Sequence, residues 1–405
     1  MPSASSPYYS ASNLPQSPAY SEVQLLPRSR SSGTFLKQSR HGIASITLTG
    51  QDGDLPAYGS GGIVDGIISF TKTEDITSIE IKIEGRLQLK EIAEGGTVDN
   101  RICLASALLW SKEQNTHCPS SCPFRLTLPS TFDLEGQSYN LPPTYSVKLS
   151  GLPGFTALAE YSICAAIGRA SFLGIGAGTT ILAAPFVYYP RTRPAAPLPA
   201  PLHLSQNGFE GTSDWQLYES TITARRSSLQ DIKTRIYVPI SRIFSASQGI
   251  PFHVTFESSA VSLASFLPFG PSGLHPKKPT RVQIMRQVAV DVRNEMVFGT
   301  KTDMWRVDCL GEAIFKHVGD GPTWTSFSGH IPVDPSIKVM GFKAGGLTVA
   351  DCILFSMTPP EPRKSPFNEL RQVVPIRLTT DPWAGGFANH NESELSVLSL
   401  NSSLE

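Results

Sequence analysis

The sequence is short of charge. Lys+Arg and Asp+Glu number 34 each in 405 residues, so the formal net charge is zero and no global field would attract nucleic acid or an anionic membrane. Charged residues make up only 17%, whereas Gly and Pro number 33 each, and this mixture suits short strands joined by turns better than long helices. We therefore expect an all-β chain, which at this length has room for two domains, each with its own core.

Cysteine is also scarce. Six cysteines, widely scattered, do not make a disulfide scaffold in a chain of this size, so a reducing compartment is expected. Cys118 and Cys122 could form half of a metal site, but no second close Cys or His pair completes it. The first residues, MPSASSPYYSASNLPQ, lack the basic start and the apolar core of a secretory signal. These observations predict a cytoplasmic protein without a metal or cofactor.

Motifs of the common enzyme classes are missing too. The eight histidines show no H-E-x-x-H spacing, and the chain has neither G-x-S-x-G nor a P-loop. Residues 170–190 are uncharged, but glycines and prolines divide them into strand, turn and strand, so a membrane helix is not expected. Within them, GIGAG is followed by Thr179, where a dinucleotide fingerprint has its third glycine. We predict that the protein is not an enzyme.

The chain is rich in two-residue alternation. In ITSIEIKIEGRLQLKE, residues 76–91, Ile and Leu occupy odd positions from Ile79 to Leu89, which predicts a half-buried strand with a bulge or bend at Gly85. Similar segments recur up to Tyr189 and again from Leu229, on either side of the proline-rich stretch YYPRTRPAAPLPAPLHL. The pattern predicts two β-sandwiches in tandem, joined by a stiff spacer.

The predicted organisation has five parts. The ends are too rich in Ser and small polar residues to order themselves. We expect a disordered Ser/Pro-rich arm (1–40), an N-terminal sandwich (41–190), a proline-rich linker and loop (191–228), a C-terminal sandwich (229–382) and a Ser-rich mobile tail (383–405).

Several motifs resemble those of a known family. LPAYGSGGIVDGIISF followed by ITSIEIKIEGRLQL is similar to the opening strands of an arrestin N-terminal domain, with Gly62-Ile63-Val64-Asp65-Gly66 as its Gly-x-Val-x-Gly element. The order of FRLTLP, LPPTYS and AEYSICAAIGR resembles the strands that follow in that domain, and FVYYPRTRPAAP resembles the linker of fungal-type alpha-arrestins. LTVADCILFSMTPPEP and VVPIRLTTD resemble a C-terminal arrestin domain more loosely. The resemblance covers roughly residues 43–382.

The resemblance implies arrestin-like immunoglobulin-type sandwiches and an adaptor function. Alpha-arrestins bind cytoplasmic segments of membrane transporters and receptors and recruit WW-domain HECT ubiquitin ligases, so that the cargo is ubiquitinated and internalised. It therefore implies a cytoplasmic protein that reaches the plasma membrane or endosomes only through its cargo. The alternative is a ligase-independent trafficking scaffold that binds cargo together with coat or endosomal proteins.

Ligase recruitment would depend on short tyrosine motifs. Pro142-Pro143-Thr144-Tyr145 spells P-P-x-Y in full, but prolines also suit the first residues of an edge strand, and Tyr145 begins an alternating apolar set. Leu55-Pro56-Ala57-Tyr58 is the L-P-x-Y variant and also lies beside a predicted strand. Two weaker x-P-x-Y copies fall in the arm, with Pro7, Tyr9, Pro18 and Tyr20 as their candidate docking residues.

Serines beside charged residues are candidate phosphorylation sites. Ser31, Ser227 and Ser228 follow arginines, as a basophilic kinase would require, although a plain loop is the preferred interpretation of both segments. Ser393 and Ser396 lie among acidic residues of the tail.

Overall fold

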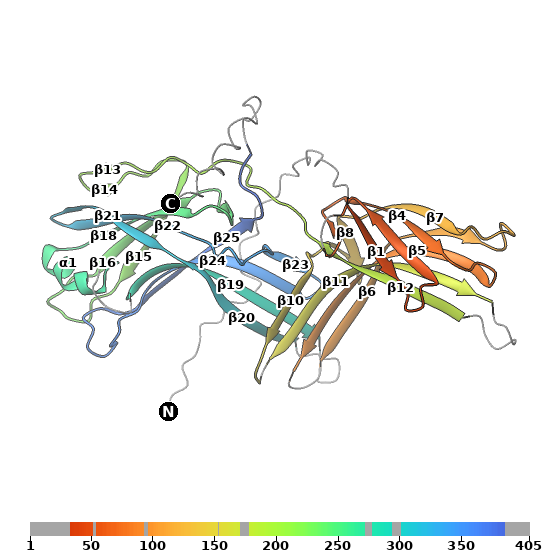
Figure 1. The fold of residues 1–405 in the computed structure, drawn as a ribbon. Helices are drawn as coiled ribbons and strands as arrows, with labels where there is room; N and C mark the ends of the chain where they lie inside the picture. The colour runs from red at the N-terminus through yellow and green to blue at the C-terminus, as the bar shows by residue number, and fades with distance from the viewer. Residues whose placement is uncertain are drawn as a thin grey trace, which may run out of the picture.

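The computed structural model describes residues 33–51, 54–92, 96–152, 154–170, 178–271, 278–293 and 301–384. These residues form two lobes of β-structure side by side (Figure 1). In the described part of the chain there is one α-helix, α1 (Ala260–Phe266), followed by the short 3-10 helix η2 (Leu267–Phe269). No described helix is long and apolar enough to cross a membrane. The all-β prediction is confirmed, and so are the two tandem sandwiches.

The N-terminal lobe packs two sheets face to face. The first has the order β1 (Thr34–Gln38), β2 (Ala44–Thr49), β4 (Ile63–Phe70), β7 (Ser121–Thr127). The second has the order β3 (Ala57–Tyr58), β12 (Gly178–Tyr188), β11 (Phe155–Arg169), β5 (Ile76–Glu91), β6 (Thr97–Ser111), and β10 (Tyr145–Leu149) also pairs with β11. β8 (Thr131–Leu134) and β9 (Gln137–Asn140) form a separate hairpin. Ile46, Val64, Ile81 and Ile163 lie fully buried between the sheets.

The C-terminal lobe repeats this plan. One sheet has the order β15 (Trp215–Ile222), β16 (Ile232–Pro239), β18 (Ile250–Glu257), β22 (Trp324–Ile331), β21 (Ile314–Gly321). The other has the order β17 (Ile243–Ser245), β25 (Leu370–Thr379), β24 (Leu347–Met357), β19 (Thr280–Arg293), β20 (Lys301–Glu312), with β23 (Phe342–Ala344) beside β24. A two-stranded ribbon, β13 (Leu204–Ser205) and β14 (Gly208–Phe209), precedes them. The core contains a group of phenylalanines in which Phe256 contacts Phe266, Phe327 and Phe355.

Strand β5 follows the predicted alternation, because its odd-numbered residues are buried almost throughout. A bulge or bend was predicted at Gly85, and the register of β5 against β6 shifts just before it, between Ile83 and Glu84. Gly85 pairs with Tyr161 of β11, and a Cβ at Gly85 would lie 2.9 Å from the tyrosine ring. The glycine therefore leaves room for an aromatic ring to lie over the strand.

Strand pairing begins earlier in both lobes than the predicted boundaries. Residues 34–38, inside the predicted arm, pair with β2, and residues 215–222, inside the predicted linker, pair with β16. Both are outer strands of their sheets, with hydrogen bonds to one neighbour, and they carry fewer buried side chains than central strands. Their hydrophobic pattern is correspondingly weak.

Candidate functional site: the interdomain junction

The two sandwiches meet where the ends of four long strands, β5, β11, β19 and β24, pack together. We call this region the interdomain junction. On β5, residues up to Ile83 belong to the N-terminal core, whereas Leu87 and Leu89 extend beyond it. On β19, Val282 and Ile284 belong to the C-terminal core. Val288, Val290 and Val292 of the same strand extend toward the other lobe. The buried cluster shared between the lobes comprises Leu87, Leu89, Phe155, Ala157, Ala159, Val288, Val290, Val292, Leu347 and Val349. The two lobes are therefore joined by a third apolar core, separate from the core of each sandwich.

A glycine turn of the C-terminal lobe reaches into the N-terminal lobe. Gly345 and Gly346, between β23 and β24, have φ values of +47° and +89°, as a tight hairpin turn requires. A Cβ at Gly345 would meet Leu87 Cδ2 at 2.7 Å, so the turn also needs glycine for close approach. Ala344, just before it, is fully buried within the N-terminal core cluster.

A buried ion pair lies where the C-terminal core ends and the junction begins. Arg286 of β19 donates from Nε and Nη2 to the two carboxylate oxygens of Asp351 of β24, at 2.7 and 2.9 Å. Its Nη1 donates to the carbonyl of Val339 at 2.7 Å. The two side chains are only 6% and 1% exposed. Burial opposes the charge of Arg286, but its hydrogen bonds to the Asp351 carboxylate and the charge of that carboxylate outweigh this effect, so the pKa of Arg286 is raised.

The P-P-x-Y stretch lies at this junction. Pro142 and Pro143 are buried, and the Pro142 carbonyl accepts a hydrogen bond from the Tyr161 hydroxyl at 2.5 Å. Thr144 exchanges two hydrogen bonds with Tyr188, from its N–H to the Tyr188 carbonyl and from the Tyr188 N–H to its Oγ1.

Tyr145 begins β10 and packs edge to face on Phe342 of the other lobe, with ring centroids 5.4 Å apart. Burial raises the pKa of Tyr145. A WW domain would reach this motif only after local opening of the strand and the junction.

The L-P-x-Y stretch is also part of the fold. Tyr58 pairs with Tyr188 in the short parallel ladder of β3 and β12, and its ring meets Phe186 edge to face at 5.3 Å. Burial raises the pKa of Tyr58 to about 12. Pro56 is buried and its carbonyl accepts the Val187 N–H, whereas Leu55 is exposed.

The remaining candidates have no contact with the junction in the described residues. Ser227 and Ser228 are exposed in the turn between β15 and β16, beside Arg225 and Arg226. The other candidates lie outside the described residues: Pro7, Tyr9, Pro18, Tyr20, Ser31, Ser393 and Ser396.

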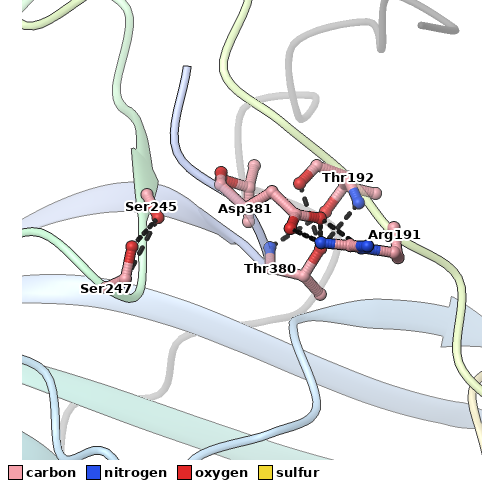
Figure 2. Close-up of polar contacts among 7 residues, drawn as sticks. Arg191, Thr192, Ser245, Ser247, Thr380 and Asp381 are labelled. Carbon is pink, nitrogen blue, oxygen red and sulfur yellow. Dashed lines mark hydrogen bonds and ion pairs between the residues drawn. The ribbon is translucent and has the colours of Figure 1, made fainter. Parts of the chain in front are cut away.

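A second polar contact, which we call the linker clasp, fastens the linker to the end of β25 (Figure 2). Arg191 forms a two-point ion pair with Asp381, in which Nε lies 2.9 Å from Oδ2. The Thr192 N–H donates to Thr380 Oγ1 at 2.8 Å, and the Asp381 N–H donates to the Thr192 carbonyl at 3.0 Å. Although burial opposes ionisation, hydrogen bonds from Arg191 and Thr380 hold the pKa of Asp381 below its ordinary value.

Sequence reasoning did not single out the clasp. Its partners are separated by about 190 positions, so no local pattern pairs Arg191 with Asp381. The available signal was that both residues lie in segments with an arrestin resemblance, Arg191 in FVYYPRTRPAAP and Asp381 at the end of VVPIRLTTD.

One solved structure similar to this chain is squid arrestin. The two are 11% identical, with a TM-score of 0.39, and the match covers 87% of this chain and 99% of the squid protein. No family model and no curated protein matches the sequence. Because this identity and TM-score are low, we base the two-sandwich architecture on the strand pairing and the core clusters of the chain itself.

Proposed function

We propose that the chain is a cytoplasmic adaptor of the alpha-arrestin kind, fungal type. It links membrane transporters or receptors to a WW-domain HECT ubiquitin ligase, so that the cargo is ubiquitinated and internalised. It reaches the plasma membrane or endosomes through its cargo and carries out no chemistry itself. The motif resemblance between residues 43 and 382 supports this proposal.

The observation that carries the proposal is the shared junction. The ends of β5, β11, β19 and β24 bury one apolar cluster. This shared packing fixes the orientation of the two sandwiches, and therefore of their sheet faces, relative to each other. Broad, open sheet faces suit extended peptide and protein segments, whereas small-molecule sites are concave and enclosed. Such a body can hold a cytoplasmic segment of a membrane protein while another part of the chain engages a ligase.

A ligase-independent scaffold is the second candidate, favoured by one observation. Pro142, Pro143 and Tyr145 are packed within the fold. The one complete P-P-x-Y match in the described residues is therefore not accessible to a ligase. In that case the chain would sort cargo by binding coat or endosomal proteins.

The experiment compares ubiquitinated membrane proteins in cells with and without the chain. The adaptor proposal predicts that loss of the chain lowers ubiquitination of a defined set of transporters or receptors and raises their abundance at the cell surface. Restoration by the full-length chain is the control. Changed surface abundance with unchanged ubiquitination would favour the scaffold, and no change in either would contradict both.

A further inference from the structure

Strand β20 is the last strand of its sheet, and among the described residues it pairs with β19 alone (Figure 1). It is 12 residues long. The one shift in its register lies opposite Ile284 and Met285 of β19, which leaves residues 301–309 regularly paired. The other edge of β20 is therefore a long, regular row of backbone donors and acceptors, which is the usual template for pairing with another strand.

The outward side chains of β20 carry no charge. Trp305, Val307 and Cys309 are exposed, by 52% for Trp305 and 44% for Val307, and they alternate with the half-buried Arg306 and Asp308. Residues directly opposite each other in a sheet point to the same side, so this face continues over β19 and β24. We call it the β20 face, formed by Trp305, Val307, Cys309, Met285, Gln287, Ala289, Thr348, Ala350 and Cys352.

The corresponding strand of the N-terminal lobe is protected. Strand β6 also ends its sheet, but two bulges interrupt its register against β5. Its outward face is charged, because Arg86 of β5 forms ion pairs with Asp99 of β6 and Glu160 of β11, at 2.7 and 3.4 Å. Bulges and charges are the devices that keep outer strands apart. Residues 305–309 of β20 have neither a bulge nor an outward charge.

The exposed edge of β20 is complementary to itself. Two identical strands that pair antiparallel are related by a twofold axis, so one residue lies opposite its own copy. With Val307 on that axis, Trp305 lies opposite Cys309 of the second copy, and Arg306 lies opposite Asp308 of the second copy. Within one chain, Arg306 Nε lies 2.8 Å from Asp308 Oδ2, and the two side chains are 37% and 36% exposed. Each can therefore also meet an opposite charge on the second copy.

The same charges disfavour the neighbouring registers. An axis on Arg306 would place this guanidinium opposite itself, and an axis on Asp308 would place two carboxylates opposite each other. Like charges directly opposite in a ladder are destabilising. The axis on Val307 is the one of these three that pairs opposite charges. It also joins the β20 faces of the two copies into one continuous surface without charge.

We propose that β20 is a dimerisation edge, through which two copies of this chain pair antiparallel with Val307 on the twofold axis. This inference goes beyond the proposed adaptor function and does not depend on it. In an adaptor, a dimer would carry two copies of each docking motif, which favours multivalent binding.

The first test measures the mass of the purified full-length chain by sedimentation velocity at about 1 to 100 μM. We expect the wild type to approach twice the mass of one chain as the concentration rises. Val307→Lys places two ammonium groups together on the axis and should weaken the dimer at least about tenfold. The matched control is Val318→Lys, at a position of β21 that is 40% exposed, on the outer strand of the other sheet. It should associate like wild type.

The second test reverses the charges. Arg306→Asp and Asp308→Arg each place like charges opposite each other in a dimer of the variant, so each variant alone should be monomeric. An equal mixture of the two variants restores opposite charges at both positions and should form a mixed dimer. Arg306 also donates to the Lys148 carbonyl at 2.9 Å, so thermal unfolding of each variant accompanies the test. A folding defect cannot produce the recovery in the mixture.

Three results would overturn the inference. The first is a wild-type chain that stays monomeric at every concentration, which would leave the adaptor function untouched. The second is a dimer that Val307→Lys forms as tightly as wild type, because another surface would then join the copies. The third is a charge-reversal mixture that stays monomeric although both variants are folded.

Discussion

The ring of Tyr145, in the N-terminal sandwich, meets the ring of Phe342, in the C-terminal sandwich, edge to face at 5.4 Å. The tyrosine of the P-P-x-Y motif is thus a residue of the interdomain junction. Engagement of this motif by a WW domain and closure of the junction are mutually exclusive, because the same side chain serves both.

The interaction energy between these two rings can be measured by a double-mutant cycle. Tyr145→Ala removes a half-buried ring and should lower the free energy of unfolding by roughly 1–3 kcal/mol. The cycle with Phe342→Ala should give a coupling energy of about 0.5–1.5 kcal/mol in urea titrations. Tyr145→Phe, which keeps the ring, is the control and should stay near wild type. Strictly additive effects of the two alanines would show that the rings do not interact in solution.

The glycine turn between β23 and β24 gives a second prediction. Gly345→Ala adds strain at positive φ and places a Cβ against Leu87 Cδ2, so we expect a loss of roughly 2–3 kcal/mol. Gly136→Ala is the matched control, since Gly136 also has a positive φ, +77°, but nothing within 4 Å of an added Cβ. It should cost only about 1 kcal/mol in the same unfolding assay. Equal losses would mean that the turn does not press on the N-terminal lobe.

The buried pair Arg286–Asp351 should tolerate joint replacement better than single removal. Asp351→Ala leaves a buried guanidinium without its carboxylate and should destabilise the protein by about 3–5 kcal/mol. The double replacement Arg286→Met/Asp351→Leu removes both charges and should recover most of that loss. Chemical denaturation of the two variants checks the order. A single variant as stable as the double one would contradict the burial described for this pair.

His253 predicts a specific dependence of stability on pH. Its Nε2 accepts the Leu202 N–H, so Nδ1 carries the proton and donates to Ser328 Oγ at 2.8 Å. Phe209 and Trp215 flank the ring, and burial lowers the pKa of His253 from 6.5 to about 4. The unfolded chain therefore binds a proton near pH 6.5 that the folded chain refuses until about pH 4.

The stabilising contribution is complete above pH 6.5 and is lost as the pH falls toward 4, a difference on the order of 3 kcal/mol. Urea unfolding between pH 7 and 4 should show a smaller decline for His253→Gln than for wild type. The slope is the readout, because the variant can also change the stability at pH 7. Parallel curves would mean that His253 has the same pKa in the folded and the unfolded chain.

Alternation in the sequence predicted the strand at residues 76–91 because nearly every odd position there faces apolar neighbours. The same reasoning failed on β6, where Ile102, Leu104, Leu108 and Trp110 suggest one face. Two bulges shift the register of β6 against β5, so Trp110 is buried while Leu108 is 55% exposed. A bulge depends on the partner strand and leaves no period in the sequence.

The junction and the path of the linker were beyond sequence reasoning for a different reason. The proline-rich stretch predicted a stiff spacer, and composition gives no sign that Leu202 is buried beside His253, 51 positions away. The position of Tyr145 on Phe342 likewise depends on how the two sandwiches meet. Long-range packing of this kind is fixed by the tertiary fold and not by local propensity.

The most direct test of the adaptor account is the affinity of the purified full-length wild-type chain for a tandem WW fragment of a HECT ubiquitin ligase, measured by calorimetry. The account predicts saturable binding, abolished when the WW grooves are mutated at their aromatic residues. Absence of binding by a folded chain would contradict the link to the ligase and leave the ligase-independent scaffold in its place.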